Sequence, residues 1–150
     1  MKKIVIIAGD PNSINSELII KSWNKLSKTI KKKIYIIGSY DLIKEQLKKL
    51  KYSNKLVKLN SIKEKIDQKK INILNIDLNF QDPFKVSRVS AAKFVKRSLD
   101  MAHLLCEKKI IEGFINCPIN KNILPSKNGV TEYLAIKNNV RDNSEVMLIR

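Results

Sequence analysis

Short apolar runs alternate with longer amphipathic stretches along this chain of 150 residues. Runs rich in β-branched residues predict buried strands, and they lie at 4–8, 33–38, 55–59, 71–78, 113–116 and 145–149. Apolar residues at helical spacing predict helices at 40–50, 90–109 and 131–138. Another helix is expected to begin near Ser13 or Ser16, either of which would cap it, and to bury Leu18, Ile19, Trp23 and Leu26.

This order of strands and helices predicts an α/β fold, in which a three-layer, mainly parallel sheet has helices on both faces. No internal repeat or low-complexity linker divides the sequence, so residues 1–150 are expected to form a single α/β segment. The last predicted strand has no helix after it to cover the sheet. We therefore expect the segment to belong to a longer, two-domain chain, and a complete small α/β domain is the alternative, because 150 residues is an ordinary domain length.

The chain is strongly basic, with a formal net charge of +16. The excess comes from 26 Lys against 4 Arg, and the lysines are scattered along the whole sequence. Nucleic-acid surfaces favour arginine and aromatic side chains, whereas aromatic residues make up only 6% here. Lysine, asparagine and isoleucine share A/T-rich codons, so we attribute the charge to codon composition and expect no nucleic-acid partner. A polyanion-binding module is the alternative.

The N-terminal apolar run is too short for a signal peptide and breaks at Gly9. No run approaches the roughly 20 apolar residues of a membrane span, so a cytoplasmic protein without a membrane partner is expected. Cys106, Cys117 and the single histidine, His103, lack the spacing of a zinc site. His103 and Cys106 are interpreted as packed structural residues, and Cys117, at the mouth of a strand, has no nearby histidine in sequence to make it a thiolate.

Two turns that follow predicted strands are candidates for ligand binding. Residues 9–14 follow the first strand, where a phosphate-binding turn would lie, but they contain one glycine and match no phosphate-loop motif. A tight turn before a capped helix is the favoured interpretation. Residues 117–121 follow a later strand, and Lys121 is either an anion contact or one more surface lysine. Thr131, at a helix start, is either a cap or a phosphate ligand.

These segments together resemble the 4-hydroxythreonine-4-phosphate dehydrogenase family of vitamin B6 biosynthesis. The family opens with Gly-Glu-Pro-Ala-Gly-Ile-Gly-Pro-Glu, and residues 9–17 here read Gly-Asp-Pro-Asn-Ser-Ile-Asn-Ser-Glu. A later family strand ends in Thr-x-Pro-Ile-Asn-Lys, which resembles residues 116–121, and the family's Gly-His-Thr-Glu resembles residues 129–132. The helix start at residues 89–92 is also similar. The resemblance covers nearly all of this chain and somewhat less than half of a family member.

The resemblance implies an isopropylmalate-dehydrogenase-like fold and a homodimer with the active site between domains. It implies oxidation of 4-phosphooxy-threonine by NAD or NADP, followed by decarboxylation, in pyridoxal phosphate biosynthesis. A divalent metal (Zn, Mg or Co), held by three histidines, would polarise the reacting oxygen. The family's His-Thr pair binds substrate; Thr131 keeps the threonine, and Val130 replaces the histidine.

The chain departs from the family in ways that affect the expected activity. Val130 cannot hydrogen-bond a substrate, a loss of roughly 1.5–3 kcal/mol for a charged partner. The family's metal-binding histidines lie beyond residue 150 and His103 matches none of them, so no metal ligand is expected in this chain, which alone is expected to be inactive. No catalytic or cofactor-binding residue is assigned. Alternatives are a dehydrogenase of a related phosphorylated hydroxy acid, such as threonate phosphate, and a non-catalytic α/β binding domain.

Overall fold

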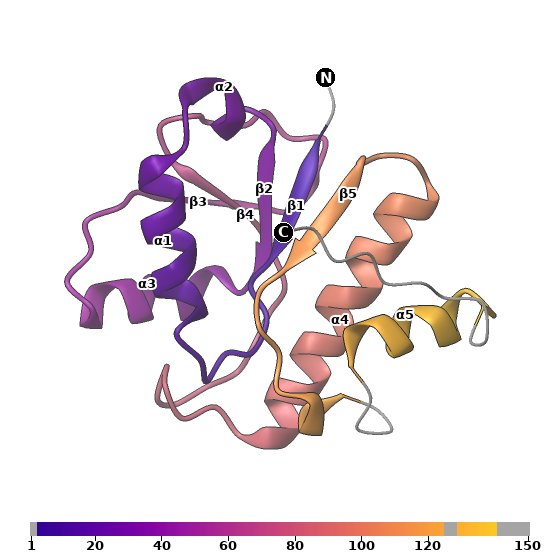
Figure 1. Ribbon diagram of the computed structural model, residues 1–150. Helices are drawn as coiled ribbons and strands as arrows, with labels where there is room; N and C mark the ends of the chain where they lie inside the picture. Colours follow the sequence, from indigo (N-terminus) through magenta and orange to yellow (C-terminus); the bar gives the residue numbers. More distant parts are fainter. Residues whose placement is uncertain (1–2, 125–128, 141–150) are drawn as a thin grey trace.

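The computed structural model describes residues 3–124 and 129–140. Five strands form one parallel sheet in the order β3-β4-β2-β1-β5, which confirms the predicted α/β class (Figure 1). The strands are β1 (Ile4–Ile7), β2 (Ile34–Gly38), β3 (Leu56–Leu59), β4 (Ile71–Asn75) and β5 (Gly113–Asn116). The helices are α1 (Asn15–Lys25), α2 (Lys28–Lys31), α3 (Tyr40–Lys49), α4 (Arg88–Glu107), η1 (Lys121–Ile123) and α5 (Val130–Lys137). The strand predicted at 145–149 lies outside the described residues.

The strand order explains why helices cover both faces of the sheet. The chain moves from β1 through β2 to β3 in one direction, and then from β4 back across the sheet to β5. Crossovers between parallel strands are right-handed, so reversing the direction moves the connecting helix to the opposite face. Helices α1 and α3 accordingly lie on one face and α4 on the other (Figure 1).

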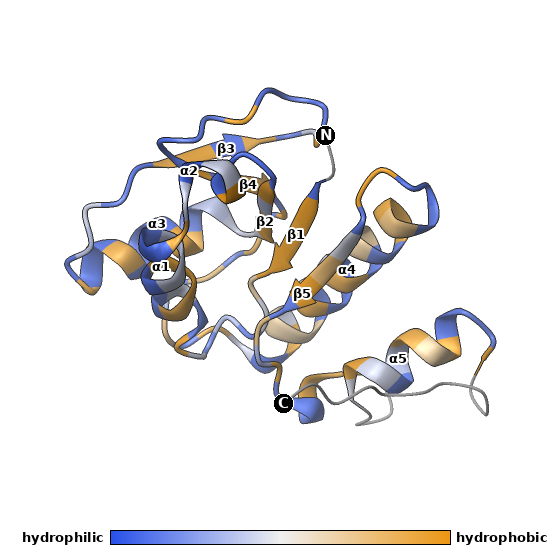
Figure 2. Ribbon diagram, turned by 45° about the horizontal axis from the view of Figure 1, so that its top comes forward, coloured by the Kyte–Doolittle hydropathy of each residue, from blue (hydrophilic) through white to orange (hydrophobic). Residues whose placement is uncertain are grey.

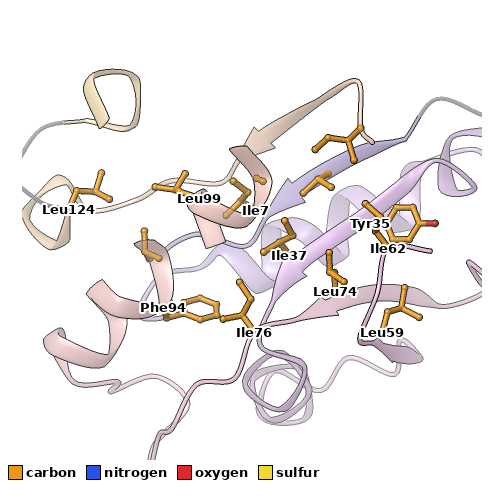
Figure 3. Close-up of a cluster of buried hydrophobic side chains, with 14 residues drawn as sticks. Ile7, Tyr35, Ile37, Leu59, Ile62, Leu74, Ile76, Phe94, Leu99 and Leu124 are labelled. Carbon is orange, nitrogen blue, oxygen red and sulfur yellow. The ribbon is translucent and has the colours of Figure 1, made fainter. Parts of the chain in front are cut away.

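Two apolar clusters hold the helices to the sheet. On the first face, Ile19, Ile20 and Trp23 of α1 pack with residues of α3 and the sheet. On the second face, Phe94, Val95 and Leu99 of α4 pack against the sheet. We call this second group the α4-face cluster, and Figure 3 shows its buried side chains. Figure 2 shows the central strands as an almost continuously hydrophobic layer, as expected for strands buried on both faces.

The start of α1 differs from the prediction. Ile14 precedes the helix and makes no side-chain cap. Ser16 instead donates to Gln46 (2.5 Å), so the predicted serine cap is wrong. Ile19 and Trp23 are buried as predicted, but Leu18 is 40% exposed and Ile20 is fully buried, because the buried face of α1 includes Ile20 and not Leu18.

Other boundaries shift by a few residues. The predicted strand at 71–78 ends at Asn75, because its partner β2 ends at Gly38, the last paired position. Helix α4 begins two residues early, where Ser87 caps it by accepting from the Ser90 amide. The short elements α2 and η1 were not predicted.

The connection between β3 and β4 contains no helix, although the two strands are parallel neighbours. The fully buried Asn72 holds this connection: its Oδ1 accepts from the Asp67 amide (2.9 Å), and its Nδ2 donates to the carbonyls of Asp67 (2.8 Å) and Lys70 (2.9 Å). Ile62 and Ile66 pack with the α4-face cluster. A buried carboxamide and two apolar side chains thus replace a crossover helix. Across the described part of the chain, no helix has the length and apolar character needed to cross a membrane.

Candidate functional site

The carboxyl ends of the five strands define one edge of the sheet, at the bottom of Figure 1. Strands β1 and β5 are neighbours, but the chain leaves them toward opposite faces. Open parallel sheets bind ligands at such a switch point, outside the carboxyl ends of the strands. Here the loop after β1 and the segment after β5 meet at that position.

Gly9 allows the two segments to approach each other. Its φ of +75° is in the left-handed region, which favours glycine. A Cβ atom there would lie 2.8 Å from the Pro118 carbonyl oxygen, 2.9 Å from that of Cys117 and 2.6 Å from Nδ2 of Asn15. Glycine is therefore required both by the backbone conformation and by the close approach.

Asn15 joins the opening loop to the segment after β5. Its Nδ2 donates to the Pro118 carbonyl (2.8 Å), and the Asp10 amide donates to the same oxygen (3.3 Å). Asn15 is 2% exposed, and its Oδ1 has no hydrogen-bond partner among the described residues. The role of Asn15 is not evident from the sequence, because asparagine near a helix start is ordinarily read as a cap.

The opening loop is also tied to the segment before α4. Asn12 and Val86 exchange two hydrogen bonds, from Nδ2 to the Val86 carbonyl (2.9 Å) and from the Val86 amide to Oδ1 (2.7 Å). The buried Gln46 donates to the carbonyls of Pro11 (2.8 Å) and Pro83 (2.6 Å) while accepting from Ser16. One carboxamide thus connects the opening loop, α1, α3 and the 79–87 loop.

These contacts account for the polar residues in the opening loop. Asn12, Ser13 and Asn15 stand where the resembled family has Ala or Gly, and each makes an internal hydrogen bond. Asp10 accepts from the Asn12 amide (2.9 Å). The loop is therefore a turn, as predicted, rather than an open cradle of backbone amides. Its side chains bond within the loop and to residues 86 and 118, and the side-chain cap predicted after it is absent.

Apolar side chains anchor the segment after β5 on the α4 face of the sheet. Ile119 and Ile123 pack against the α4-face cluster, and Leu124 is buried within it. Arg88 donates to the Asn122 carbonyl (2.8 Å). Lys121 lies in the middle of this anchored segment with its side chain exposed.

An open hollow of about 590 Å³ lies between β5 and α5. Thr131 and Val130 line it, together with the polar Asn116 and Asn138 and the apolar Phe114, Ile119, Leu134, Ala135 and Val140. Lys121 is not among its lining residues. Gly129, not Thr131, is the N-cap of α5, so the capping interpretation of Thr131 is wrong. Thr131 is exposed and makes no side-chain hydrogen bond with the described residues, which leaves its hydroxyl free to contact a ligand.

Helix α5 is fixed to α4 through Asp100. This carboxylate accepts from the Tyr133 hydroxyl (2.5 Å) and pairs with Lys137 (2.9 Å) and Lys96 (2.8 Å). Partial burial alone would raise the pKa of Asp100, but the hydrogen bonds from Lys137, Lys96 and Tyr133 outweigh it and lower the pKa to about 2. Burial and the adjacent carboxylate raise the pKa of Tyr133. The network holds the helix that carries Thr131.

The histidine and the cysteines have structural surroundings. His103 is buried, with Nε2 3.0 Å from Oδ1 of Asn138 and Nδ1 3.4 Å from Glu107. The structure agrees with the interpretation of His103 as a packed residue and places Glu107, one helical turn away, beside it. Cys106 packs at the margin of the α4-face cluster rather than inside it, and Cys117 packs against the other cluster. Burial raises the pKa of both thiols, which disfavours a reactive thiolate.

The described residues contain no group of three or more His, Cys, Asp or Glu side chains that could hold a metal ion. The partly buried Asp100 and the buried His103, which both contact residues of α5 or its C-cap, already have protein partners. The residues described here therefore do not fit the divalent metal that the family resemblance implies, and no chemical step is derived through a metal.

A parallel sheet whose loops converge at the β1–β5 switch point defines a doubly wound α/β protein. The chain belongs to the family described as "Pyridoxal phosphate biosynthetic protein PdxA", whose model matches residues 29–150. This confirms the resemblance inferred from the two motifs after β5.

Individual relatives agree with this assignment. The chain is 27% identical, over 157 aligned positions, to a 4-hydroxythreonine-4-phosphate dehydrogenase of Sulfurihydrogenibium, covering all of this chain and 47% of that protein. It is 28% identical to a Clostridium botulinum protein with a provisional D-threonate 4-phosphate dehydrogenase name, covering 98% of this chain and 46% of that protein. The chain thus spans about half the length of these curated relatives.

Solved structures show the same fold. A 4-hydroxythreonine-4-phosphate dehydrogenase from Burkholderia phymatum superimposes with a TM-score of 0.72 at 20% identity, over 82% of this chain and 38% of that one. The corresponding enzyme from Klebsiella pneumoniae gives a TM-score of 0.69 at 20% identity, over 82% of this chain and 39% of that one.

Proposed function

We propose that this chain is the N-terminal part of an oxidoreductase that oxidises a phosphorylated hydroxy acid, 4-phosphooxy-threonine, in the formation of pyridoxal phosphate. The observation that supports this most directly is the position of the two family motifs. Residues 117–121 leave β5, and residues 129–132 begin α5, so both border the same end of the same edge strand. Their order and spacing match the family, and Thr131 is exposed on the hollow between them.

In this proposal Thr131 donates its hydroxyl hydrogen to an oxygen of the substrate. The N-terminus of α5 favours negative charge at the same place, because its first amides point out of the helix. Lys121, which does not line the hollow, would act only as a positive charge from the neighbouring segment. Val130 makes only apolar contact, so the family's histidine contact has to be replaced or lost.

The remaining parts of the reaction are assigned outside this chain. NAD or NADP would accept the hydride, and a divalent metal would polarise the hydroxyl oxygen, with ligands contributed by residues beyond 150. The proposed enzyme is a cytoplasmic homodimer whose active site lies between two domains. Within this chain, the hydrogen bonds of Asn12, Asn15 and Gln46 hold the loops at the switch point in place.

The test is a turnover assay on the natural protein that contains this chain. NADH or NADPH formation is followed with 4-phosphooxy-threonine and a divalent metal. The proposal expects turnover that depends on both the phosphate group and the metal. No turnover at millimolar substrate, with folding verified by circular dichroism, would reject the dehydrogenase assignment.

A second substrate is favoured by two observations. Val130 replaces the family's substrate-binding histidine, and a relative of similar identity has a D-threonate 4-phosphate dehydrogenase name. The two substrates share the phosphate and a hydroxy acid but differ in the amino group. A panel containing both compounds, compared by kcat/KM, distinguishes them, and restoring the imidazole by Val130→His would shift the ratio if position 130 contacts this part of the substrate.

A further inference from the structure

A second hollow, of about 340 Å³, lies at the opposite edge of the sheet, where the strands begin. Four lysines contribute to its lining, from segments far apart in sequence: Lys3 precedes β1, Lys32 precedes β2, and Lys63 and Lys65 belong to the connection before β4. Tyr35, Glu64, Ile66 and Gln68 complete it. Nothing in the proposed dehydrogenase function uses this edge.

The base of the hollow is fixed by Lys3 and Tyr35. The Lys3 ammonium donates to the Ile62 carbonyl (2.8 Å) and lies 5.3 Å from the centre of the Tyr35 ring. Tyr35 is only 4% exposed, and in Figure 3 its hydroxyl points away from the aliphatic side chains of the cluster. Burial raises the pKa of Tyr35, so the hydroxyl stays protonated and able to donate near neutral pH.

Among the described residues, Glu64 is the single carboxylate that lines the hollow, and it already has hydrogen-bond donors. Glu64 accepts from the amides of Asn60 and Ser61, both at 2.7 Å. Lys32, Lys63 and Lys65 form no ion pair with the described residues. Elsewhere, five of the described lysines pair with carboxylates, Lys21 with Glu17, Lys49 with Asp82, Lys70 with Asp67, and Lys96 and Lys137 with Asp100. Other surface lysines in the described part of the chain are also unpaired, so the distinguishing feature of the hollow is that four lysines line one depression. The hollow therefore gathers four ammonium groups against one carboxylate, and their mutual repulsion favours a bound anion.

The segment that carries two of these lysines is held in place. Buried Asn72 makes three hydrogen bonds to residues 67 and 70, and the side chains of Ile62 and Ile66 pack into the α4-face cluster. Residues 63 and 65 are thus carried by a connection that is anchored on both sides, rather than by a free loop.

We propose that this hollow binds a compact oligophosphate, a chain of two or three phosphate groups. Its lining contains lysine but no arginine, and ammonium groups bind phosphate as point charges. Its one aromatic ring is buried and offers no stacking surface, which disfavours single-stranded nucleic acid. An open hollow of about 340 Å³, rather than an extended basic stripe, suits a short anion. The anion is either free oligophosphate or the phosphate tail of a nucleotide.

The proposal is tested by calorimetric titration of the natural protein that contains this chain with tripolyphosphate and, separately, with ATP. Tripolyphosphate is expected to bind with one-to-one stoichiometry and to weaken as salt is raised, because counterions compete for the lysines. Comparable binding of ATP would mean that a nucleotide tail suffices, and weaker binding of ATP would mean that the site prefers the free anion. Binding of ATP without tripolyphosphate would overturn the proposal, because recognition would then not depend on the phosphate chain.

Matched variants locate the site. The double substitution Lys63→Gln with Lys65→Gln is expected to weaken tripolyphosphate binding by at least about tenfold. The control, Lys44→Gln with Lys48→Gln, removes the same charge from another hollow, beside α3, and is expected to change affinity by less than about twofold. Equal losses in both variants, or no binding by the parent chain, would overturn the proposal. The four substituted lysines are all exposed, and thermal unfolding of each variant verifies that it is folded.

Discussion

The two ends of the sheet are built alike but carry different chemistry. Each end has a connection held by a buried carboxamide, Gln46 at the carboxyl edge and Asn72 at the amino edge. At the carboxyl edge, the loops at the switch point meet through backbone carbonyls, amides and hydroxyls. At the amino edge, four lysines converge on one hollow (the loops at the top of Figure 1).

The two ends also differ in how they accommodate left-handed backbone. At the carboxyl edge this conformation falls on Gly9, where no Cβ fits. At the amino edge it falls on Lys51 and Lys109, which follow α3 and α4 and have φ values of 60° and 53°. Among the left-handed positions of the described residues, glycine occupies the one where the backbone of residues 117 and 118 fills the space, whereas Lys51, Lys109 and Asn139 are exposed residues that follow helices.

The largest expected difference between the two ends of the sheet comes from replacing one glutamine by glutamate at each end. Gln46→Glu replaces the donor of two buried hydrogen bonds with a carboxylate, and we expect it to lower the free energy of unfolding by about 3 kcal/mol. Gln68→Glu places the same carboxylate on an exposed position beside the lysines, where it is expected to be neutral or slightly stabilising at low salt. Urea unfolding followed by circular dichroism measures both, and equal losses would show that the two ends do not differ in this way.

The next effect concerns glycine. Gly9→Ala is expected to destabilise the fold by about 2–3 kcal/mol, through left-handed strain and contact with the carbonyls of residues 117 and 118. Gly113→Ala is the control, since a Cβ there meets nothing within 4 Å, and its change is expected to be below about 1 kcal/mol. Similar unfolding midpoints for the two variants would contradict the close approach at Gly9.

The pH dependence of α5 docking gives a smaller effect. Asp100 has a pKa of about 2 in the folded chain against an ordinary value of 3.8, so its contribution is present above about pH 4 and is lost as pH falls toward 2. Because the group is partly exposed, we expect Asp100→Asn to cost about 1 kcal/mol at pH 7 after discounting for solvent screening. The difference between parent and variant should shrink between pH 4 and pH 2. A difference that stays constant with pH would mean that the carboxylate charge does not hold α5.

The smallest effect tests the amino edge. At the end of α4, the Lys109 amide donates to Cys106 and the Ile110 amide to Leu105, the pattern of a helix that ends in a left-handed residue. Lys109→Gly relieves that conformation and should stabilise the fold by about 0.5–1 kcal/mol. Lys108→Gly, one residue earlier at φ −77°, should destabilise it. Thermal unfolding of the two variants should therefore shift in opposite directions.

Much of the fold could be predicted from local pattern. The strands containing Ile4, Ile34 and Gly113 were predicted within a few residues, because buried parallel strands have continuous apolar runs. The motifs around Pro118 and Thr131 were sufficient for the family, which the family model confirms.

The missing parts depend on contacts between residues distant in sequence. Gln46 donates to the carbonyls of Pro11 and Pro83, which are 35 and 37 positions away in the sequence. Asn15 donates to that of Pro118, which is 103 positions away. No sequence pattern marks either residue, because the role of each depends on which backbone carbonyl the fold brings near its side chain. The lysine hollow was missed for the same reason: lysines scattered along the chain converge only once β1, β2 and β4 are aligned.

The role of the carboxyl edge is measured most directly by steady-state kinetics of the natural protein. The Thr131→Val variant is compared with a separate control variant, Thr29→Val. Thr29 is an exposed threonine of α2, far from the edge where β5 ends. If the hollow beside α5 binds the phosphorylated substrate, Thr131→Val should lower kcat/KM at least about tenfold, the worth of one hydrogen bond to a charged group, and Thr29→Val should leave it unchanged. Unaltered kcat/KM in the Thr131 variant would contradict the assignment of substrate binding to this edge.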